Sequence, residues 1–211
     1  GWVIAPKMNG LIRYGTPDDQ NDLFRALCGE KEDREYQPRR PRGAGKNSPK
    51  PPIEIHSLQK TMVRVCGNAK ERQDKAVREY MKILDSAIQE QHLDQNSVII
   101  IDASEIVDKK TVTGLVANKL AEKYHRPIVI LRSRTEEMYG GSGRGYDKGK
   151  IDNFSTFLND TKVFECAGHD NAFGVSLAKK NLGKAIELCN EKLKLDDLVT
   201  IHEVDYEVKA E

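Results

Sequence analysis

The chain has 211 residues, a length that suits one domain with an appendage or two small domains. Hydrophobic residues make up 38% and charged residues 32%, so we expect a modest core and a strongly solvated surface. The formal net charge of +1 excludes a uniformly basic surface, so any contact with nucleic acid must come from local clusters of charge. No apolar run approaches the roughly 20 residues that a membrane-spanning helix needs, and we expect no membrane partner.

Four cysteines are scattered along the chain without a C-x-x-C pair: Cys28, Cys66, Cys166 and Cys189. This usage is typical of reduced thiols and predicts a cytoplasmic protein without a disulfide framework. The chain opens with Gly1-Trp2-Val3, without methionine and within what reads as a folded segment. We therefore expect it to be a fragment of a longer protein.

The first predicted element is a short helix that begins at Thr16 and ends near Gly29. Thr16 can cap it, Pro17 suits the first helical position, and the two following aspartates complement the positive end of the helix. Apolar residues then recur at helical spacing.

The segment from Glu30 to about Pro52 has a composition that cannot form a core. It holds five of the eight prolines and carries no acidic residue between Gln37 and Pro52. Its cations are Arg39, Arg40, Arg42, Lys46 and Lys50. We expect a mobile loop or linker. Two interpretations stay open, a basic arm that follows a phosphate backbone and a solvated linker that its charge keeps extended.

A long amphipathic helix is predicted from Lys70 to Gln91, where apolar residues form one stripe, and Gly67-Asn68 could interrupt its early part. Beyond it, strands and helices alternate. A buried strand over 97–102, a helix over 111–124 that Arg126-Pro127 ends, and a buried strand over 128–131 imply a parallel crossover.

The remainder predicts a strand around a run of glycines, a short helix over 152–158, and strands over 163–166 and 173–177. A helix capped by Asn181 runs to Leu193, and a half-exposed strand covers 198–208. The predicted fold class is α/β, a mixed β-sheet with flanking helices preceded by a long connecting helix.

The run Gly140-Gly141-Ser142-Gly143-Arg144-Gly145 is followed about 25 residues later by Ala167-Gly168-His169. Small residues free backbone amides to face an anion, and an arginine adds a planar charged fork, so the pair of segments predicts a phosphate site. Tyr146 excludes a dinucleotide fingerprint, and no Gly-Lys-Ser/Thr follows to make a Walker loop. The structural alternative is a glycine-rich hairpin with a histidine bonded to backbone.

These segments resemble the Gly-Ser-x-Arg-Ser and Gly-Gly-His motifs of the DHH-associated C-terminal domain in RecJ-type exonucleases. Two further stretches are similar to RecJ-type sequences: Gly114 to Ala117 with 124–130, and Ile4 to Gly10 with Arg13. The chain departs from the pattern at Ala167, at Gly145 and at Asp108-Lys109, where a Trp-His pair is usual.

The resemblance implies four parts: 1–29 as the end of a catalytic region, 30–56 as the basic loop, 57–95 as the connecting helix, and 96–211 as the substrate-binding domain. It implies the substrate-binding portion of a single-stranded DNA-specific exonuclease, active in DNA repair. The alternatives are a phosphodiesterase for oligoribonucleotides or cyclic dinucleotides, and a non-catalytic nucleic-acid-binding module.

The resemblance also implies that two Mn²⁺ or Mg²⁺ ions are held by an N-terminal DHH domain absent from this chain. No Asp-His-His sequence occurs, and the five histidines show no spacing that would rebuild such a site. We therefore expect no metal on this fragment and no hydrolysis by it alone.

Eight residues are candidates for substrate contact. Arg144 would bind a phosphate in bidentate fashion, and Ser142 would donate a hydroxyl hydrogen bond. The glycines would provide room, with the amides of Gly143 and Gly145 approaching the anion and Gly168 opening the turn. His169 would contact a phosphate oxygen or the scissile group, while Asn9 and Arg13 would contact the strand backbone, the alternative for these two being interdomain packing. Arg126, Phe154 and Phe173 are expected to be structural, and Tyr146 could stack on a base.

Overall fold

The computed structural model describes residues 3–43, 45, 47–107 and 112–194. The chain divides into two compact units, Gly1–Lys75 and Ala76–Glu211, and the boundary falls inside the 33-residue helix α3 (Leu58–Glu90). Within the described residues, no helix is both long enough and apolar enough to cross a membrane.

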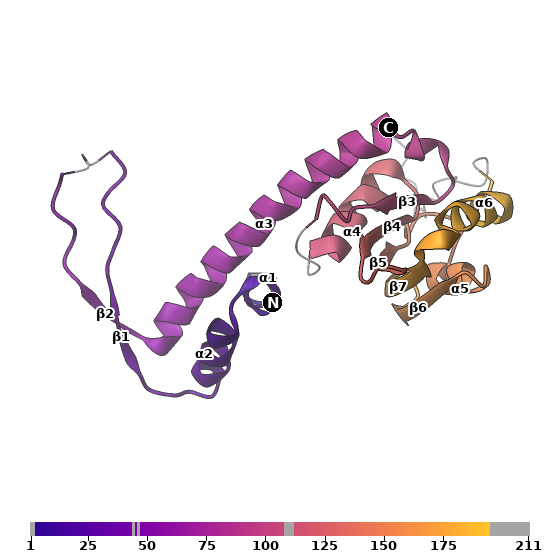
Figure 1. Cartoon of the computed structure of the whole chain (residues 1–211). Helices are drawn as coiled ribbons and strands as arrows, with labels where there is room; N and C mark the ends of the chain where they lie inside the picture. Colours follow the sequence, from indigo (N-terminus) through magenta and orange to yellow (C-terminus); the bar gives the residue numbers. More distant parts are fainter. Residues whose placement is uncertain (1–2, 44, 46, 108–111, 195–211) are drawn as a thin grey trace, which may run out of the picture. The chain divides into compact units, whose positions relative to one another are not determined.

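The first unit contains helices α1 (Ile4–Tyr14) and α2 (Pro17–Leu27), a two-stranded ribbon of β1 (Asp33–Tyr36) and β2 (Glu54–Ser57), and the beginning of α3 (Figure 1). Its core is small, formed by Leu11, Leu23, Leu58, Met62, Cys66 and Ala69. The predicted cap of α2 is confirmed, because the Thr16 hydroxyl accepts a hydrogen bond from the Asp19 amide and the Asp19 carboxylate accepts one from the Thr16 amide.

Two predictions about this unit are wrong. The basic segment contains strand β1 and leads into β2, which pair antiparallel from Asp33↔Ser57 to Tyr36↔Glu54. The sequence did not predict these strands because most of their residues are polar, so they show no alternation of apolar and polar side chains. Helix α3 is also continuous through Gly67, since one interior glycine costs only about 1 kcal/mol and the apolar stripe around it is buried.

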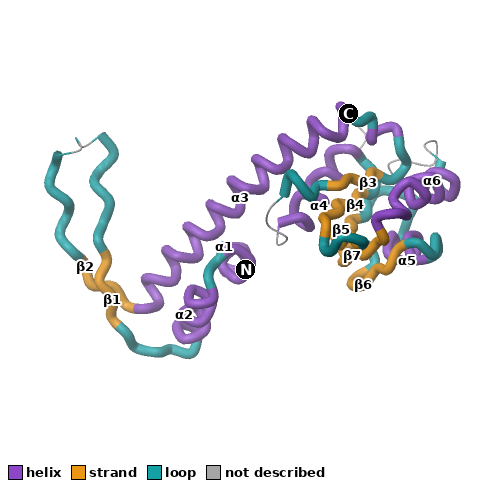
Figure 2. Tube along the Cα trace, in the orientation of Figure 1, coloured by secondary structure: helices purple, strands orange, loops and turns teal. Residues whose placement is uncertain are grey.

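The second unit is built on a five-stranded mixed sheet of order β3-β4-β5-β7-β6 (Figure 2). Its strands are β3 (Ile99–Asp102), β4 (Ile128–Ser133), β5 (Met138–Arg144), β6 (Phe164–His169) and β7 (Ala172–Ala178). Its helices after α3 are η1 (Leu93–Gln95), α4 (Thr113–Tyr124), α5 (Phe154–Asn159), η3 (Lys179–Asn181) and α6 (Leu182–Lys192). The predicted parallel pair is confirmed as β3 with β4, joined through α4, and the other pairings are antiparallel.

The two faces of the sheet are covered differently. One face carries Val129, Leu131, Val175 and Leu177 and packs with residues of α5 and α6 into the main core. The other face lies against α4 where β4 and β5 run. Because directly paired residues on neighbouring strands point to one face, the register places Ile128, Ile130, Ser142 and Arg144 together on this α4 face.

Two local details differ from the sequence predictions, and a third prediction lies outside the described residues. His169 is the last residue of β6, and the turn to β7 consists of Asp170 and Asn171, so Ala167-Gly168-His169 is strand and not turn. Asn181 stands at the start of α6, but its side chain makes no capping hydrogen bond. The predicted strand over 198–208 lies outside the described residues.

Candidate functional site

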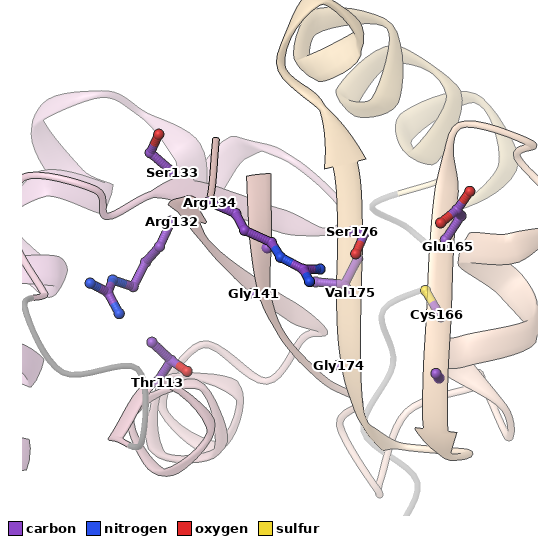
Figure 3. Close-up of a pocket in the computed structure, with 12 residues that line it drawn as sticks. Thr113, Arg132, Ser133, Arg134, Gly141, Glu165, Cys166, Gly174, Val175 and Ser176 are labelled. Carbon is purple, nitrogen blue, oxygen red and sulfur yellow. The ribbon is translucent and has the colours of Figure 1, made fainter. Parts of the chain in front are cut away.

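Small residues cover the α4 face of the sheet along β5, β7 and β6. The sheet trough, as we name this surface, consists of Gly140, Ser142, Ala167, Ala172, Gly174 and Ser176. A cavity of about 420 Å³ lies over it, lined among others by Gly140, Gly174 and Ser176 (Figure 3). A sheet face without large side chains allows a ligand to approach the backbone closely.

Two arginines that sequence reasoning missed line the same cavity. Arg132 of β4 pairs with Gly140 and so shares the trough's face, and Arg134 follows β4 directly. Figure 3 shows Arg132 reaching toward Thr113 and Arg134 extending across β5 toward Ser176. Glu165 of β6 lines the far side. The sequence holds one pattern that could have indicated these arginines, because Ile130, Arg132 and Arg134 alternate with a period of two residues, as side chains on one face of a strand do. Only the pairing of β4 with β5 shows which face of the sheet that is.

Ser142 and Arg144 lie beside the first turn of α4. The Ser142 hydroxyl is 2.8 Å from the Thr113 hydroxyl, within hydrogen-bonding distance. The half-buried Arg144 donates from Nη1 to the Gly143 carbonyl oxygen at 2.6 Å, and its Nη2 lies against Gly114, where a Cβ atom would overlap it. The absence of a side chain at Gly114 therefore leaves room for the guanidinium. The positive end of α4 lies on the same side.

His169 stands in one cross-strand row with Arg144. Arg144 pairs with Ala172, and Ala172 pairs with His169, so the arginine and the histidine share a face with one strand between them. Two strand spacings separate their backbones by about 10 Å. The exposed His169 lines a second hollow, of about 500 Å³, together with Gly145, Gly168 and Asn118.

The three glycines expected at the site have packing roles. The Gly143 and Gly168 Cα atoms flank Phe173 on the core face, and a Cβ atom on Gly143 would overlap its ring. Gly168 also has a φ of +144°, which favours glycine. The Gly145 amide donates to the Asn171 carbonyl oxygen at 3.0 Å. The expectation that the Gly143 and Gly145 amides face an anion is corrected, because Gly143 lies within β5 between two strands whose ladders use strand amides, and the Gly145 amide donates to Asn171.

Asn9 and Arg13 are both exposed on α1, in the first unit. Four residues apart, they lie on one side of that helix. They are not part of the sheet trough, and their contact with a nucleic-acid strand stays a prediction.

The residues expected to be structural behave as predicted. Phe154 and Phe173 are buried in the main core. The Arg126 guanidinium donates to the backbone carbonyl oxygens of Asp94 and Asn96, and burial lowers the pKa of Arg126. Tyr146 was not among these residues: its ring stacks on His125, with ring centroids 5.3 Å apart, and its stacking on a base stays a prediction.

The described residues contain no cluster of three or more His, Cys, Asp or Glu side chains that could hold a metal ion. The Cys166 and Cys189 thiols are not activated, because burial raises the pKa of both to about 12. The cavity over the trough is lined by the guanidinium groups of Arg132 and Arg134 and by hydroxyl groups, which are groups that can bind an anion, and by the Glu165 carboxylate.

No family model matches this chain. The chain is 35% identical over 214 aligned residues to YorK of Bacillus subtilis (strain 168), an SPbeta prophage-derived protein named as a candidate single-strand DNA-specific exonuclease. That alignment covers 99% of the chain and 35% of YorK, so the chain spans about a third of this relative's length. It is 27% identical over 138 residues to the single-stranded-DNA-specific exonuclease RecJ of the same organism, covering 59% of the chain and 16% of RecJ.

Among solved structures, RecJ from Thermus thermophilus in complex with Mn²⁺ superimposes with a TM-score of 0.58 and 14% identity. The match covers 90% of this chain and 23% of that RecJ. The Mg²⁺ complex of the same protein gives a TM-score of 0.52 and 14% identity over 70% of this chain and 22% of that RecJ. At this identity, the likeness shows the fold.

Proposed function

The chain is RecJ-like and resembles the C-terminal region of this branch of the DHH phosphoesterase family, and from that premise we propose that it forms the substrate-binding portion of a single-strand DNA-specific exonuclease. Hydrolysis of the phosphodiester bond would take place on a DHH catalytic region outside this chain.

The sheet trough is the observation that carries the proposal. It combines an open surface of small residues with three arginines on or beside one sheet face, namely Arg132, Arg134 and Arg144. Guanidinium groups bind phosphate oxygens through paired hydrogen bonds, and small residues let a sugar-phosphate backbone lie close to the sheet.

The same geometry favours recognition of the strand's backbone over recognition of its bases. Among the residues that the structure describes, those lining the trough's cavity include no aromatic ring on which a base could stack. Contacts to phosphates position a strand without reading its sequence. Arg144 and Ser142 would hold one phosphate, and His169, in the same row as Arg144, would contact the strand further along.

In this proposal, metal ions would be bound only by the DHH region. The similar RecJ structures are complexes with Mn²⁺ and Mg²⁺, which supports divalent ions in the family. The described residues of this chain do not fit such ions, since no group of three ligands is present among them. We therefore assign no catalytic step to this chain beyond holding the strand.

Replacing Arg144 by alanine tests the proposal. We expect the affinity for a labelled single strand of about 30 nucleotides to fall by roughly 1–3 kcal/mol, the usual scale for a charge-assisted contact. The matched control is Arg78→Ala, which removes the same charge from an exposed position on α3. Fluorescence anisotropy measures both, and circular dichroism checks folding. Equal affinities for the wild type and Arg144→Ala would remove Arg144 from the site.

Ligand length separates the proposal from its alternatives. A strand-holding trough should prefer the long oligonucleotide to a dinucleotide, with affinity that falls steeply with salt. Tighter binding of the dinucleotide would favour a phosphodiesterase for oligoribonucleotides or cyclic dinucleotides.

A further inference from the structure

The segment from Gln37 to Ile53 extends beyond the β1–β2 ribbon as two limbs that run side by side (Figure 1). We call it the basic arm. Its described cations are all exposed: Arg39, Arg40, Arg42 and Lys50. Lys46 adds a fifth positive charge in sequence, and no residue from Gln37 to Ile53 is acidic. Since the whole chain has a net charge of only +1, the rest of it is net negative, and the arm concentrates the positive charge.

The base of the arm is fixed to α3 by a stack of rings and charge. Tyr36, at the end of β1, stacks on His56 of β2 with ring centroids 4.8 Å apart. The Arg64 guanidinium of α3 lies over the Tyr36 ring at 4.2 Å from its centroid. A cation over an aromatic ring contributes about 0.5–2 kcal/mol. The arm therefore starts from an anchored point on the first unit.

The limbs are stiffened and held to each other. Five prolines lie in the arm and restrict its backbone, which lowers the entropy that ordering it would cost: Pro38, Pro41, Pro49, Pro51 and Pro52. The Gln37 side chain donates from Nε2 to the Pro51 carbonyl oxygen at 2.7 Å, and Arg40 donates from Nε to the Ser48 carbonyl oxygen at 2.6 Å. These two bonds connect one limb with the other.

Acidic residues near the base are engaged with other arginines. Asp22 and Glu32 both form ion pairs with Arg25 and Arg34. Glu30 pairs with Arg25 as well. This cluster holds three carboxylates and two guanidinium groups, and these ion pairs are all made with Arg25 and Arg34 and not with a cation of the arm.

We propose that the basic arm is a second contact for nucleic acid, separate from the sheet trough, and that it binds the sugar-phosphate backbone without regard to sequence. Exposed arginines and lysines in a segment that holds no acidic residue attract a polyanion, and the arm has no aromatic side chain to stack on bases. The proposal deepens the proposed function and takes the identity of the ligand, single-stranded DNA, from it.

The test is a variant that neutralises the arm, with Arg39, Arg40, Arg42 and Lys50 all changed to glutamine. The probe is a labelled deoxythymidine strand of about 40 nucleotides, titrated at several salt concentrations. Each phosphate contact on a single strand contributes about 0.7 to the slope of log K against log salt, so four lost contacts lower that slope by up to about 3. We expect at least a tenfold loss of affinity at low salt.

The matched control neutralises four exposed cations of α3, namely Lys60, Arg72, Arg78 and Lys82, which are interspersed with acids such as Glu71 and Glu79. It changes the net charge equally and should lower the slope by less than 1. Equal effects of the two variants on affinity and on the salt slope would overturn the proposal. They would mean that the arm contributes to binding only through the net charge of the chain. All eight positions are exposed, and circular dichroism verifies that both variants fold.

Comparison with Arg144→Ala and a competition experiment separate the possible outcomes. If Arg144→Ala leaves binding unchanged while the arm variant weakens it, the trough proposal fails and the arm proposal stands. If Arg144→Ala weakens binding and the arm variant matches its control, the reverse holds. Polyglutamate of equal charge serves as competitor, and displacement of DNA at equal charge concentration would overturn the phosphate assignment in favour of an acidic protein partner.

Discussion

At the scale of single residues, Gly114 and Arg144 depend on each other. The Arg144 guanidinium occupies the space that a Gly114 side chain would fill. At Gly143, the space that a side chain would fill is occupied by the Phe173 ring, which belongs to the core. An added methyl group therefore meets a movable group at Gly114 and a fixed one at Gly143.

Gly114→Ala is expected to displace the Arg144 guanidinium and to weaken single-strand binding by roughly 1–2 kcal/mol. Stability should change by less than about 1 kcal/mol, because alanine is the better helix former and the displaced group is the end of a flexible side chain. Anisotropy and thermal unfolding measure the two effects.

The comparison variant is Gly143→Ala, which should destabilise the fold by roughly 1–3 kcal/mol through overpacking against Phe173. If Gly114→Ala binds the strand as well as the wild type, Arg144 does not hold phosphate from the position described.

At the scale of elements, an ion cluster joins α2 to β1. Asp22 accepts hydrogen bonds from Arg34 at 2.6 and 2.9 Å and from Arg25 at 3.0 Å. The hydrogen bonds from Arg34 are the largest cause that lowers the pKa of Asp22, against a smaller opposing effect of burial. Such a carboxylate stabilises the fold above its unfolded pKa of about 4, and the gain is lost as the pH falls through the lower folded pKa.

Asp22→Asn should therefore lower stability by about 1 kcal/mol at pH 7 and have little effect near pH 2. Urea unfolding followed by circular dichroism at pH 7, 4 and 2 measures the difference. Asp33→Asn, at an exposed position of β1, is the control. If the free energy of unfolding of the two variants depended on pH in the same way, the ion cluster would not contribute to stability.

At the scale of the whole molecule, the chain divides within α3 into a unit that bears the basic arm and a unit that bears the sheet trough. Both proposed contacts are made by side chains that bind anions. The described residues bring no group of metal ligands together. We propose that the chain holds a strand for a reaction that other parts of the protein carry out.

The purified chain should accordingly bind a single strand and leave it intact with Mn²⁺ or Mg²⁺ present, whichever end carries the label. Gel analysis of labelled oligonucleotide checks this, with a full-length RecJ as positive control in the same buffer. Shortening of the strand by the chain, abolished by Arg144→Ala, would contradict the assignment of hydrolysis to another region.

The sequence by itself determined the elements whose cause is local. Thr16 and Pro17 fix the start of α2, the uninterrupted Val-Ile-Ile-Ile run predicts β3, and Pro127 follows the end of α4, because capping, burial and backbone restriction act within a few residues. The residue types and spacing also predict Ser142, Arg144 and His169 as contacts for a phosphate, and that role stays a prediction.

Only the tertiary structure decided which of these residues share a face. Register put Arg132 beside Gly140 and His169 in a row with Arg144, and it turned Gly143 toward Phe173. A shift of one residue would have reversed each assignment, since neighbours along a strand point to opposite faces. Pairing between strands distant in sequence fixes the register, and no local pattern contains that information.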